Sequence, residues 1–153
     1  MEGAGALRDA MTSGESIRAE NLTTLVFDAF PSFFEVWAKP DLGVFAGSLT
    51  LHRFLTGFAI HSAHVLFHRE HREFLRVLEF VERVHVAGTP GAADKIVFYY
   101  LEGLAMALNG YGLDLAWVES RAGPRTRESI QLLRATNLWE GLALREEFGV
   151  KLS

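Results

Sequence analysis

The chain has 153 residues, a net charge of −4 and a hydrophobic fraction of 49%, which suits one folded domain with a sizeable core. The absence of cysteine excludes disulfides, thiolate metal sites and a cysteine nucleophile, and the mild acidity argues against a nucleic-acid binder. No signal peptide is visible, and no apolar run reaches the ~18 residues of a membrane span. We therefore expect a soluble, cytoplasmic protein without membrane association.

The predicted elements begin after a Gly- and Ala-rich segment. Residues 1–14 are expected to form a flexible N-terminal arm, and residues 15–153 a single helical domain. Apolar side chains at helical spacing predict a first helix over residues 15–29, which a following proline ends or kinks. A short second helix is expected over residues 32–38, with Ser32 as its N-cap.

The middle of the chain predicts three helices. Residues 47–68 and 71–86 both carry a helical apolar stripe. A single helix of about 40 residues is long for a compact domain, so a break is expected near residues 68–72. Gly88 is a stop signal, and the Thr-Pro pair that follows it predicts the start of a helix over residues 90–109.

Two more helices are predicted over residues 113–121 and 124–144, the second beginning at a Gly-Pro pair. No segment alternates with period two for long enough to predict a strand. The expected fold is all-α: a compact bundle, or an α-α superhelix-like array, of six or seven helices joined by short loops.

Histidines at spacings of 3, 4 and 3 residues are the most distinctive feature of the chain. On one continuous helix they would share an edge, and imidazoles three or four residues apart can bind zinc, nickel or copper. Four ligands on one helix cannot surround a metal tetrahedrally, however, and no zincin motif is present. We expect no cofactor, and we favour a packed, partner-facing or pH-sensitive edge over a metal site. The four residues are His61, His64, His68 and His71.

Charged residues of alternating sign follow the histidines. Glu73 with Arg76, and Glu79 with Arg83, have the spacing of helical ion pairs, which is typical of a solvated helix face. Arginines also cluster further on, around Pro124, where a helix start could contact phosphate. No Gly-rich phosphate loop or strand precedes that start. The cluster consists of Arg121, Arg125, Arg127 and Arg134.

Motifs of common enzymes are missing from the chain. It contains no G-x-S-x-G motif, no Walker-type loop and no dinucleotide fingerprint. We therefore expect a protein that is not an enzyme and that acts by binding.

Three stretches carry a family resemblance: LTTLVFDAFPSFF (22–34), HREFLRVLEFVERV (71–84) and IVFYYLEGLA (96–105), with a helix start at 123–128. In these features, which span most of residues 20–135, the chain resembles small bacterial all-helical proteins associated with polymorphic toxin systems. The stretches are packing patterns, and the histidine-rich helix is not part of them. The resemblance implies an immunity protein that neutralises a cognate toxin by direct binding, and an acidic protein such as this would associate faster with a basic toxin.

The alternatives are a small-ligand-binding or regulatory helical domain and a metal-binding protein that uses the histidines. A toxin-binding surface needs a few aromatic or charged anchors, and the protein is expected to act as a monomer or homodimer. The predicted partner-binding residues are exposed carboxylates and loop aromatics: Glu70, Glu73, Glu79, Glu82, Tyr111 and Trp117.

Overall fold

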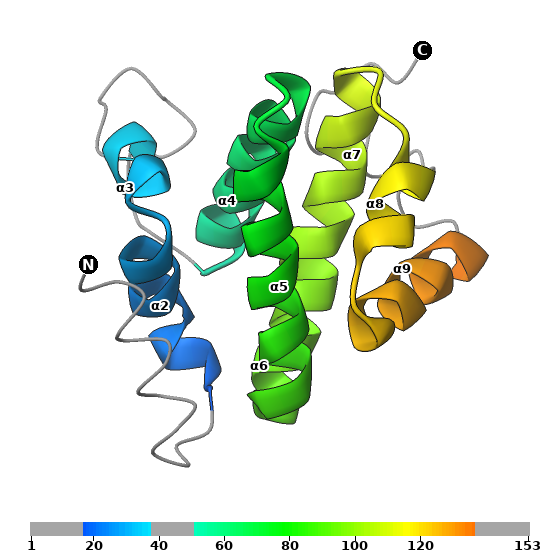
Figure 1. The fold of residues 1–153 in the computed structure, drawn as a ribbon. Coiled ribbons are helices and arrows are strands. Elements are labelled where there is room, and N and C mark those ends of the chain that lie inside the picture. Colours follow the sequence, from blue (N-terminus) through cyan, green and yellow to red (C-terminus); the bar gives the residue numbers. More distant parts are fainter. Residues whose placement is uncertain (1–16, 38–50, 137–153) are drawn as a thin grey trace.

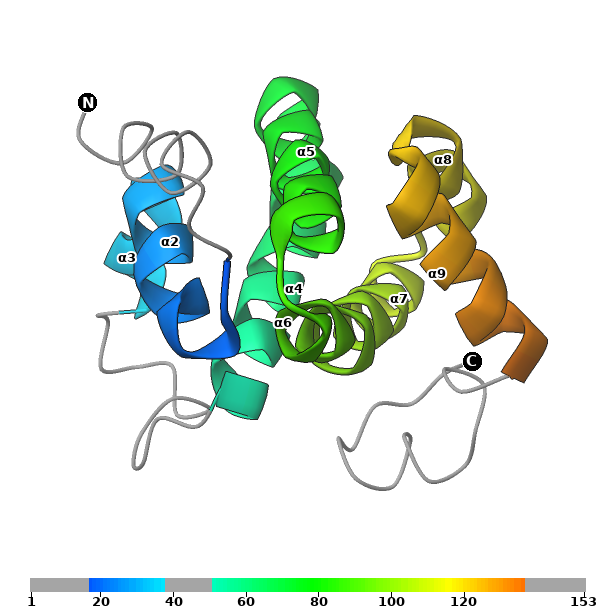
Figure 2. The ribbon, with the colours of Figure 1, turned by 90° about the horizontal axis from the view of Figure 1, so that it is seen from below.

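A computed structural model describes residues 17–37 and 51–136 of the chain. Over these residues the fold is an all-α bundle, as predicted, with seven helices when the continuous stretch 90–110 is counted once. Helices α4 to α7 form the centre, with α2–α3 on one side and α8–α9 on the other, in both views (Figures 1 and 2). The elements are η1 (Ala19–Asn21), α2 (Leu22–Ala29), α3 (Pro31–Trp37), α4 (Leu51–Phe67), α5 (His71–Ala87), α6 (Pro90–Lys95), η3 (Ile96–Leu101), α7 (Glu102–Gly110), α8 (Leu115–Arg121) and α9 (Pro124–Thr136).

The predicted start of the first helix is wrong. Ile17 does not belong to a helix but forms an isolated bridge with Gly88, in which its N–H donates to the Ala87 carbonyl at 3.3 Å. The Thr89 N–H donates back to the Ile17 carbonyl at 2.8 Å. Because the Ile17 side chain is fully buried, this pairing satisfies a backbone that would otherwise lose its hydrogen bonds to water. Regular helix therefore begins only at Leu22, and the predicted arm lies outside the described residues.

The second helix begins one residue earlier than predicted, at Pro31 instead of after a Ser32 cap. Pro31 takes the first helical position, where a missing N–H costs nothing and the fixed φ suits the helix. The chain turns just before it, at Phe30, which leaves the helical region with ψ 74°. The predicted end of this helix, at Ala38, lies outside the described residues.

Two separate helices, α4 and α5, follow, each of 17 residues, so the predicted break near residues 68–72 is confirmed. Residues 47–50, where the first of them was expected to begin, lie outside the described part. Neither helix, nor any other among the described residues, is long and apolar enough to cross a membrane.

The predicted helix over residues 90–109 is present, but its middle is π-helical. The Thr89 hydroxyl accepts from the Ala92 N–H at 3.3 Å and caps its start, as the sequence indicates. In the π-helical segment η3, Tyr100 is fully buried, and its hydroxyl donates to Ser62 Oγ at 3.0 Å. Ser62 in turn donates to the Phe58 carbonyl at 2.7 Å, so a polar chain joins η3 to α4.

The core around this chain is largely aromatic. The ring of Phe58 on α4 contacts two other rings. Its centroid lies 5.2 Å from that of Tyr100 on η3 and 5.4 Å from that of Phe30, which follows α2. Phe33 packs against Phe54 at 5.5 Å and against Phe58 at 5.2 Å. Tilted and edge-on rings at such distances add attraction to the burial of apolar area. This core joins α2 and α3 to α4 and η3.

Of the last two described helices, α8 begins at Leu115, two residues later than predicted, and α9 begins where expected. Asp114 caps α8 by accepting from the Ala116 N–H at 2.9 Å, and Pro124 is the first residue of α9. The predicted continuation of α9 over residues 137–144 lies outside the described part.

Candidate functional site

The candidate site is an aromatic surface at the end of the bundle where α4 passes into α5 and α7 passes into α8. Helices α4 and α7 pack against each other. Both end at the same side of the bundle, at the top of Figure 1, because α5, which follows α4 in the chain, runs in the opposite direction. We call this surface the aromatic corner. It consists of His64, Phe67, His68, His71, Tyr111 and Trp117.

The backbone at the corner turns sharply because both helices end in the same capping motif. At the end of α4, Arg69 is left-handed with φ 61°; its N–H donates to the Leu66 carbonyl and the Glu70 N–H to the Val65 carbonyl. This is a Schellman ending, which usually has glycine at the left-handed position. Helix α7 ends in the same way with Gly112 at φ 70°. Arginine gives no sequence signal for such a turn, whereas glycine does.

Phe67 and Tyr111 form the first half of the corner. Their rings are stacked with centroids 4.8 Å apart, and the Tyr111 hydroxyl lies 3.2 Å from His64 Nδ1. The His64 and His68 rings meet edge-on at 4.3 Å. The Phe67 side chain is nevertheless 48% exposed. A large apolar ring is thus held at the surface by its aromatic neighbours.

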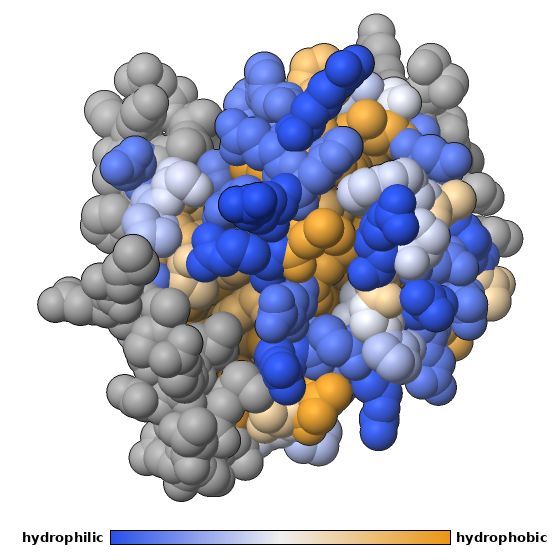
Figure 3. Space-filling model, in the orientation of Figure 1, coloured by the Kyte–Doolittle hydropathy of each residue, from blue (hydrophilic) through white to orange (hydrophobic). Residues whose placement is uncertain are grey.

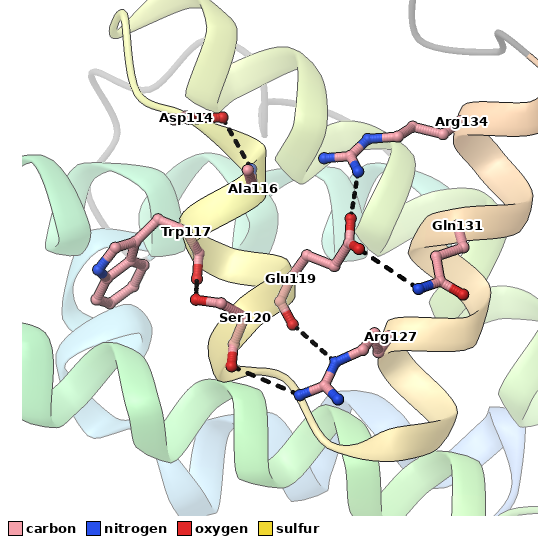
Figure 4. A network of polar contacts seen from close by, with 8 residues as sticks. All are labelled: Asp114, Ala116, Trp117, Glu119, Ser120, Arg127, Gln131 and Arg134. Carbon is pink, nitrogen blue, oxygen red and sulfur yellow. Dashed lines mark hydrogen bonds and ion pairs between the residues drawn. The ribbon is translucent and has the colours of Figure 1, made fainter.

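Trp117 forms the second half of the corner. Its ring lies 5.4 Å from His71 and 6.1 Å from Phe74, and the Arg121 guanidinium lies 5.3 Å from the ring centroid. Trp117 points away from the polar contacts between α8 and α9 (Figure 4). The ring is therefore placed against the start of α5, with one cation beside it.

The predicted histidine edge is split by the tertiary structure. His61 turns toward α3, with Nε2 3.5 Å from Ser32 Oγ and its ring 5.3 Å from Phe33. Burial lowers the pKa of His61 to about 4, helped by His64 and opposed by the charge of Glu70. His61 is therefore neutral at pH 7.

The other three histidines do not join His61 in one site. His64 and His68 are neighbours, whereas His71 lies beside Trp117 on the next helix. Within residues 17–37 and 51–136, no three His, Asp or Glu side chains gather as a metal site would require. The structure gives the four-histidine metal site no support.

One of the predicted partner-binding carboxylates, Glu70, adjoins the corner, whereas Glu73 pairs on the side of α5 that contacts α2. Glu70 is exposed in the turn between α4 and α5. Glu73 accepts from Arg76 Nη1 at 3.0 Å, which confirms that predicted pair. Arg76 also donates to the Ala29 carbonyl at 3.0 Å and thereby holds α5 against α2. The Glu70 side chain forms no hydrogen bond or ion pair with any described residue, whereas Glu73 pairs with Arg76.

Glu82 has a structural role that the sequence does not reveal. Its carboxylate accepts from the Thr126 N–H and hydroxyl, both at 2.9 Å, and from the Arg125 N–H at 3.2 Å. Burial raises the pKa of Glu82, but these hydrogen bonds and the nearby His85 outweigh burial and hold it below its usual value. Glu82 is thus an N-terminal cap of α9 supplied by α5. The anion site that we considered for phosphate near Pro124 is filled by the protein itself.

Two of the four clustered arginines, Arg127 and Arg134, also serve the fold. Arg127 donates to the carbonyls of Glu119 and Ala122, at 3.1 and 3.0 Å, and so closes the end of α8. Arg134 forms an ion pair with the Glu119 carboxylate, which also accepts from Gln131 (Figure 4). These side chains join α8 to α9, so they do not form a free basic patch.

A second surface feature is a groove of about 320 Å³ along α5, facing the connection between α8 and α9. Apolar surface lies between hydrophilic side chains over this part of the molecule (Figure 3). Glu79 lines the groove without an ion pair or hydrogen bond to any described residue, so its predicted pair with Arg83 is wrong. The lining residues are Leu75, Leu78, Glu79, Glu82, Arg83, Val86, Arg121 and Gly123.

Tyr111 and Trp117 were predicted as binding residues, and the structure brings both to the aromatic corner. Phe67 was missed, although it stands one position off the apolar stripe of its helix, next to Leu66. An apolar residue just off the stripe is the signal that could have found it.

Comparisons of the chain with protein families, with curated proteins and with solved structures found no match. The function therefore has to be inferred from the chemistry of the aromatic corner and the groove, and from the resemblance in the sequence.

Proposed function

We propose that this protein is an immunity protein that neutralises a cognate bacterial toxin by binding it directly through the aromatic corner. The observation that carries the proposal is Phe67, a large apolar side chain that is 48% exposed. Aromatic side chains at the centre of an interface supply much of its binding energy. The resemblance to all-helical proteins of toxin systems supports the same role.

The neighbours of Phe67 strengthen this proposal. Tyr111 stacks on Phe67, and Trp117 lies between His71 and Arg121, so the rings have few conformations to lose on binding. Tyrosine, tryptophan and arginine are the residue types most often found among the energetically important residues of interfaces. A net charge of −4 would speed the encounter with a basic toxin.

The alternative functions have less support from the geometry. A metal-binding protein would need ligands that converge, and the four histidines are divided among three environments. A small-ligand protein would need an enclosed pocket with convergent polar groups. The groove along α5 is instead an open surface feature lined by both apolar and charged side chains.

The test is to co-express the protein with the product of the adjacent gene and to measure complex formation and rescue of cell growth. We expect a 1:1 complex that abolishes toxicity. Phe67→Ala and Trp117→Ala should each weaken binding by at least about tenfold, as truncation of an interface anchor does.

Phe98→Ala is the matched control, because Phe98 is also exposed, at 52%, but lies on η3 outside the corner. It should bind as tightly as wild type. Circular dichroism and thermal unfolding must show that all three variants are folded. If the folded Phe67→Ala and Trp117→Ala proteins bind and protect as well as wild type, the corner is not the contact surface. If the neighbouring product is neither toxic nor bound, the proposed function is wrong.

A further inference from the structure

The outward side of α5 carries four exposed residues in the order apolar, acidic, basic, apolar. An antiparallel copy of the same helix would therefore place apolar against apolar and acid against base. Leu75 and Val86 are apolar and are 42% and 61% exposed. Between them lie Glu79 and Arg83, both exposed. We call these four residues the α5 strip. The three intervals between them are four, four and three residues, so the strip follows one side of the helix.

The two charges of the strip are free of partners within the described part of the chain. Glu79 and Arg83 have the spacing at which helical ion pairs form. Nonetheless, no ion pair or hydrogen bond joins either side chain to any of the described residues. On the same helix, by contrast, Glu73 and Arg76 do form an ion pair, with 3.0 Å between Glu73 Oε2 and Arg76 Nη1. The strip thus offers one charge of each sign, unpaired within residues 17–37 and 51–136, between two exposed apolar side chains.

We propose that a second copy of this chain docks on the strip, with the two α5 helices antiparallel about a two-fold axis near residues 80–82. In that register Leu75 faces Val86 of the second copy, and Glu79 faces Arg83 of the second copy. Two-fold symmetry repeats both contacts, as in an isologous interface. A parallel arrangement would instead place Glu79 against Glu79 and Arg83 against Arg83, which like-charge repulsion opposes.

The groove gives the second helix a place to lie. Arg121 and Gly123 form its far wall, so the α5 of one copy would sit between α5 and the α8–α9 connection of the other. The distance along the helix from Leu75 to Val86 is about 16 Å, or three turns. A contact of that length is at the small end of specific interfaces. The dimer should therefore dissociate reversibly, and it should weaken as salt screens the charges.

The test is sedimentation velocity of the full chain at protein concentrations up to about 1 mM, which covers weak association. Wild type should shift from monomer to dimer. Glu79→Arg and Arg83→Glu should each raise the dissociation constant at least tenfold, because each places like charges together twice. The double variant Glu79→Arg/Arg83→Glu should restore association. Glu128→Arg on α9, which is exposed and outside the strip, is the matched control and should dimerise like wild type.

A cross-linking experiment tests the direction of the helices. Because the chain contains no cysteine, Glu79→Cys and Arg83→Cys each introduce a single thiol. In the antiparallel register, oxidation of a mixture of the two variants should give disulfide-linked heterodimers more readily than either variant gives homodimers. Preferential homodimers of both variants would indicate parallel helices and overturn the proposal.

A wild type that stays monomeric to about 1 mM would overturn the dimer, and so would a double variant that fails to restore association. The strip and the aromatic corner share no residue, although Arg121 borders both. Failure of the dimer therefore leaves toxin binding standing, and failure of toxin binding leaves the dimer standing.

Discussion

Replacing Glu82 by glutamine should test whether a carboxylate on α5 holds the N-terminus of α9. In the wild type this carboxylate accepts three hydrogen bonds, two from Thr126 and one from Arg125. Glutamine has nearly the same shape as glutamate, but it carries no charge, and its amide NH₂ group would face hydrogen-bond donors at the start of α9. At least one donor of α9 then has no acceptor.

The expected loss of stability can be estimated from the cost of removing an N-cap residue, because Glu82 acts as an N-cap of α9. Removing an N-cap costs about 0.5–2 kcal/mol, and a charge at a helix terminus adds up to ~1 kcal/mol. Since Glu82 is partly solvent-screened, we expect Glu82→Gln to lower the free energy of unfolding by about 1–2 kcal/mol at pH 7. The midpoint of thermal unfolding should fall by about 2–4 °C for each kcal/mol.

The destabilisation caused by Glu82→Gln should become smaller as the pH falls. The pKa of Glu82 is lower in the folded protein than its usual 4.5, so the folded state favours the ionised form. The contribution of Glu82 to the free energy of unfolding is fully present above the pKa of its unfolded form, and it is lost as the pH falls through the pKa of its folded form. The difference in stability between wild type and Glu82→Gln should therefore shrink on acidification below pH 4.5.

The assay is urea unfolding of wild type and Glu82→Gln at pH 7 and at several values below pH 4.5, followed by circular dichroism. Glu128→Gln is the matched control, because Glu128 is an exposed carboxylate on α9. It should change stability by less than about 0.5 kcal/mol. The capping role is refuted if Glu82→Gln is as stable as Glu128→Gln at pH 7, or if its deficit does not change with pH.

Two further results are expected, one from urea unfolding and one from an NMR titration. Gly123→Ala should destabilise the protein by about 1–2 kcal/mol, since its new Cβ would lie 2.4 Å from Glu82 Cδ and displace the cap. Gly91→Ala is its control, because a Cβ there meets nothing within 4 Å; equal stability of the two variants would contradict the clash. His61 should titrate near pH 4 in NMR spectra, and because its pKa is lower folded than unfolded, the protein should lose stability as pH falls from 6.5 to 4. A His61→Gln variant should lose less over that interval, and a His61 resonance that titrates near 6.5 would show that the ring is not buried.

Much of the fold could be predicted because helices are determined by local patterns. The starts at Pro90 and Pro124 and the break between α4 and α5 were all indicated by caps, prolines or apolar periodicity. The start of the first helix was not, because the position of Ile17 depends on a backbone bridge to Gly88, about 70 residues further along the chain.

The candidate site was only partly accessible from the sequence. Tyr111 and Trp117 could be selected as aromatics near predicted turns. Spacing alone placed four histidines on one edge, but a left-handed Arg69 ends α4 before His71 and separates that residue from the others. A helix-ending arginine has no pattern of its own, because the left-handed conformation is usually marked by glycine.

By itself, the sequence determined the all-α class, most helix boundaries and the amphipathic nature of α5, since these follow from contacts within a few residues. The Glu73–Arg76 pair on α5 followed from spacing within that helix. Only the tertiary structure decided that Glu82 caps α9 and that Glu79 has no partner among the described residues, although both looked alike as exposed helical carboxylates. The physical reason is that a side chain's partner is set by the helix packed beside it, and that neighbour comes from a distant part of the chain.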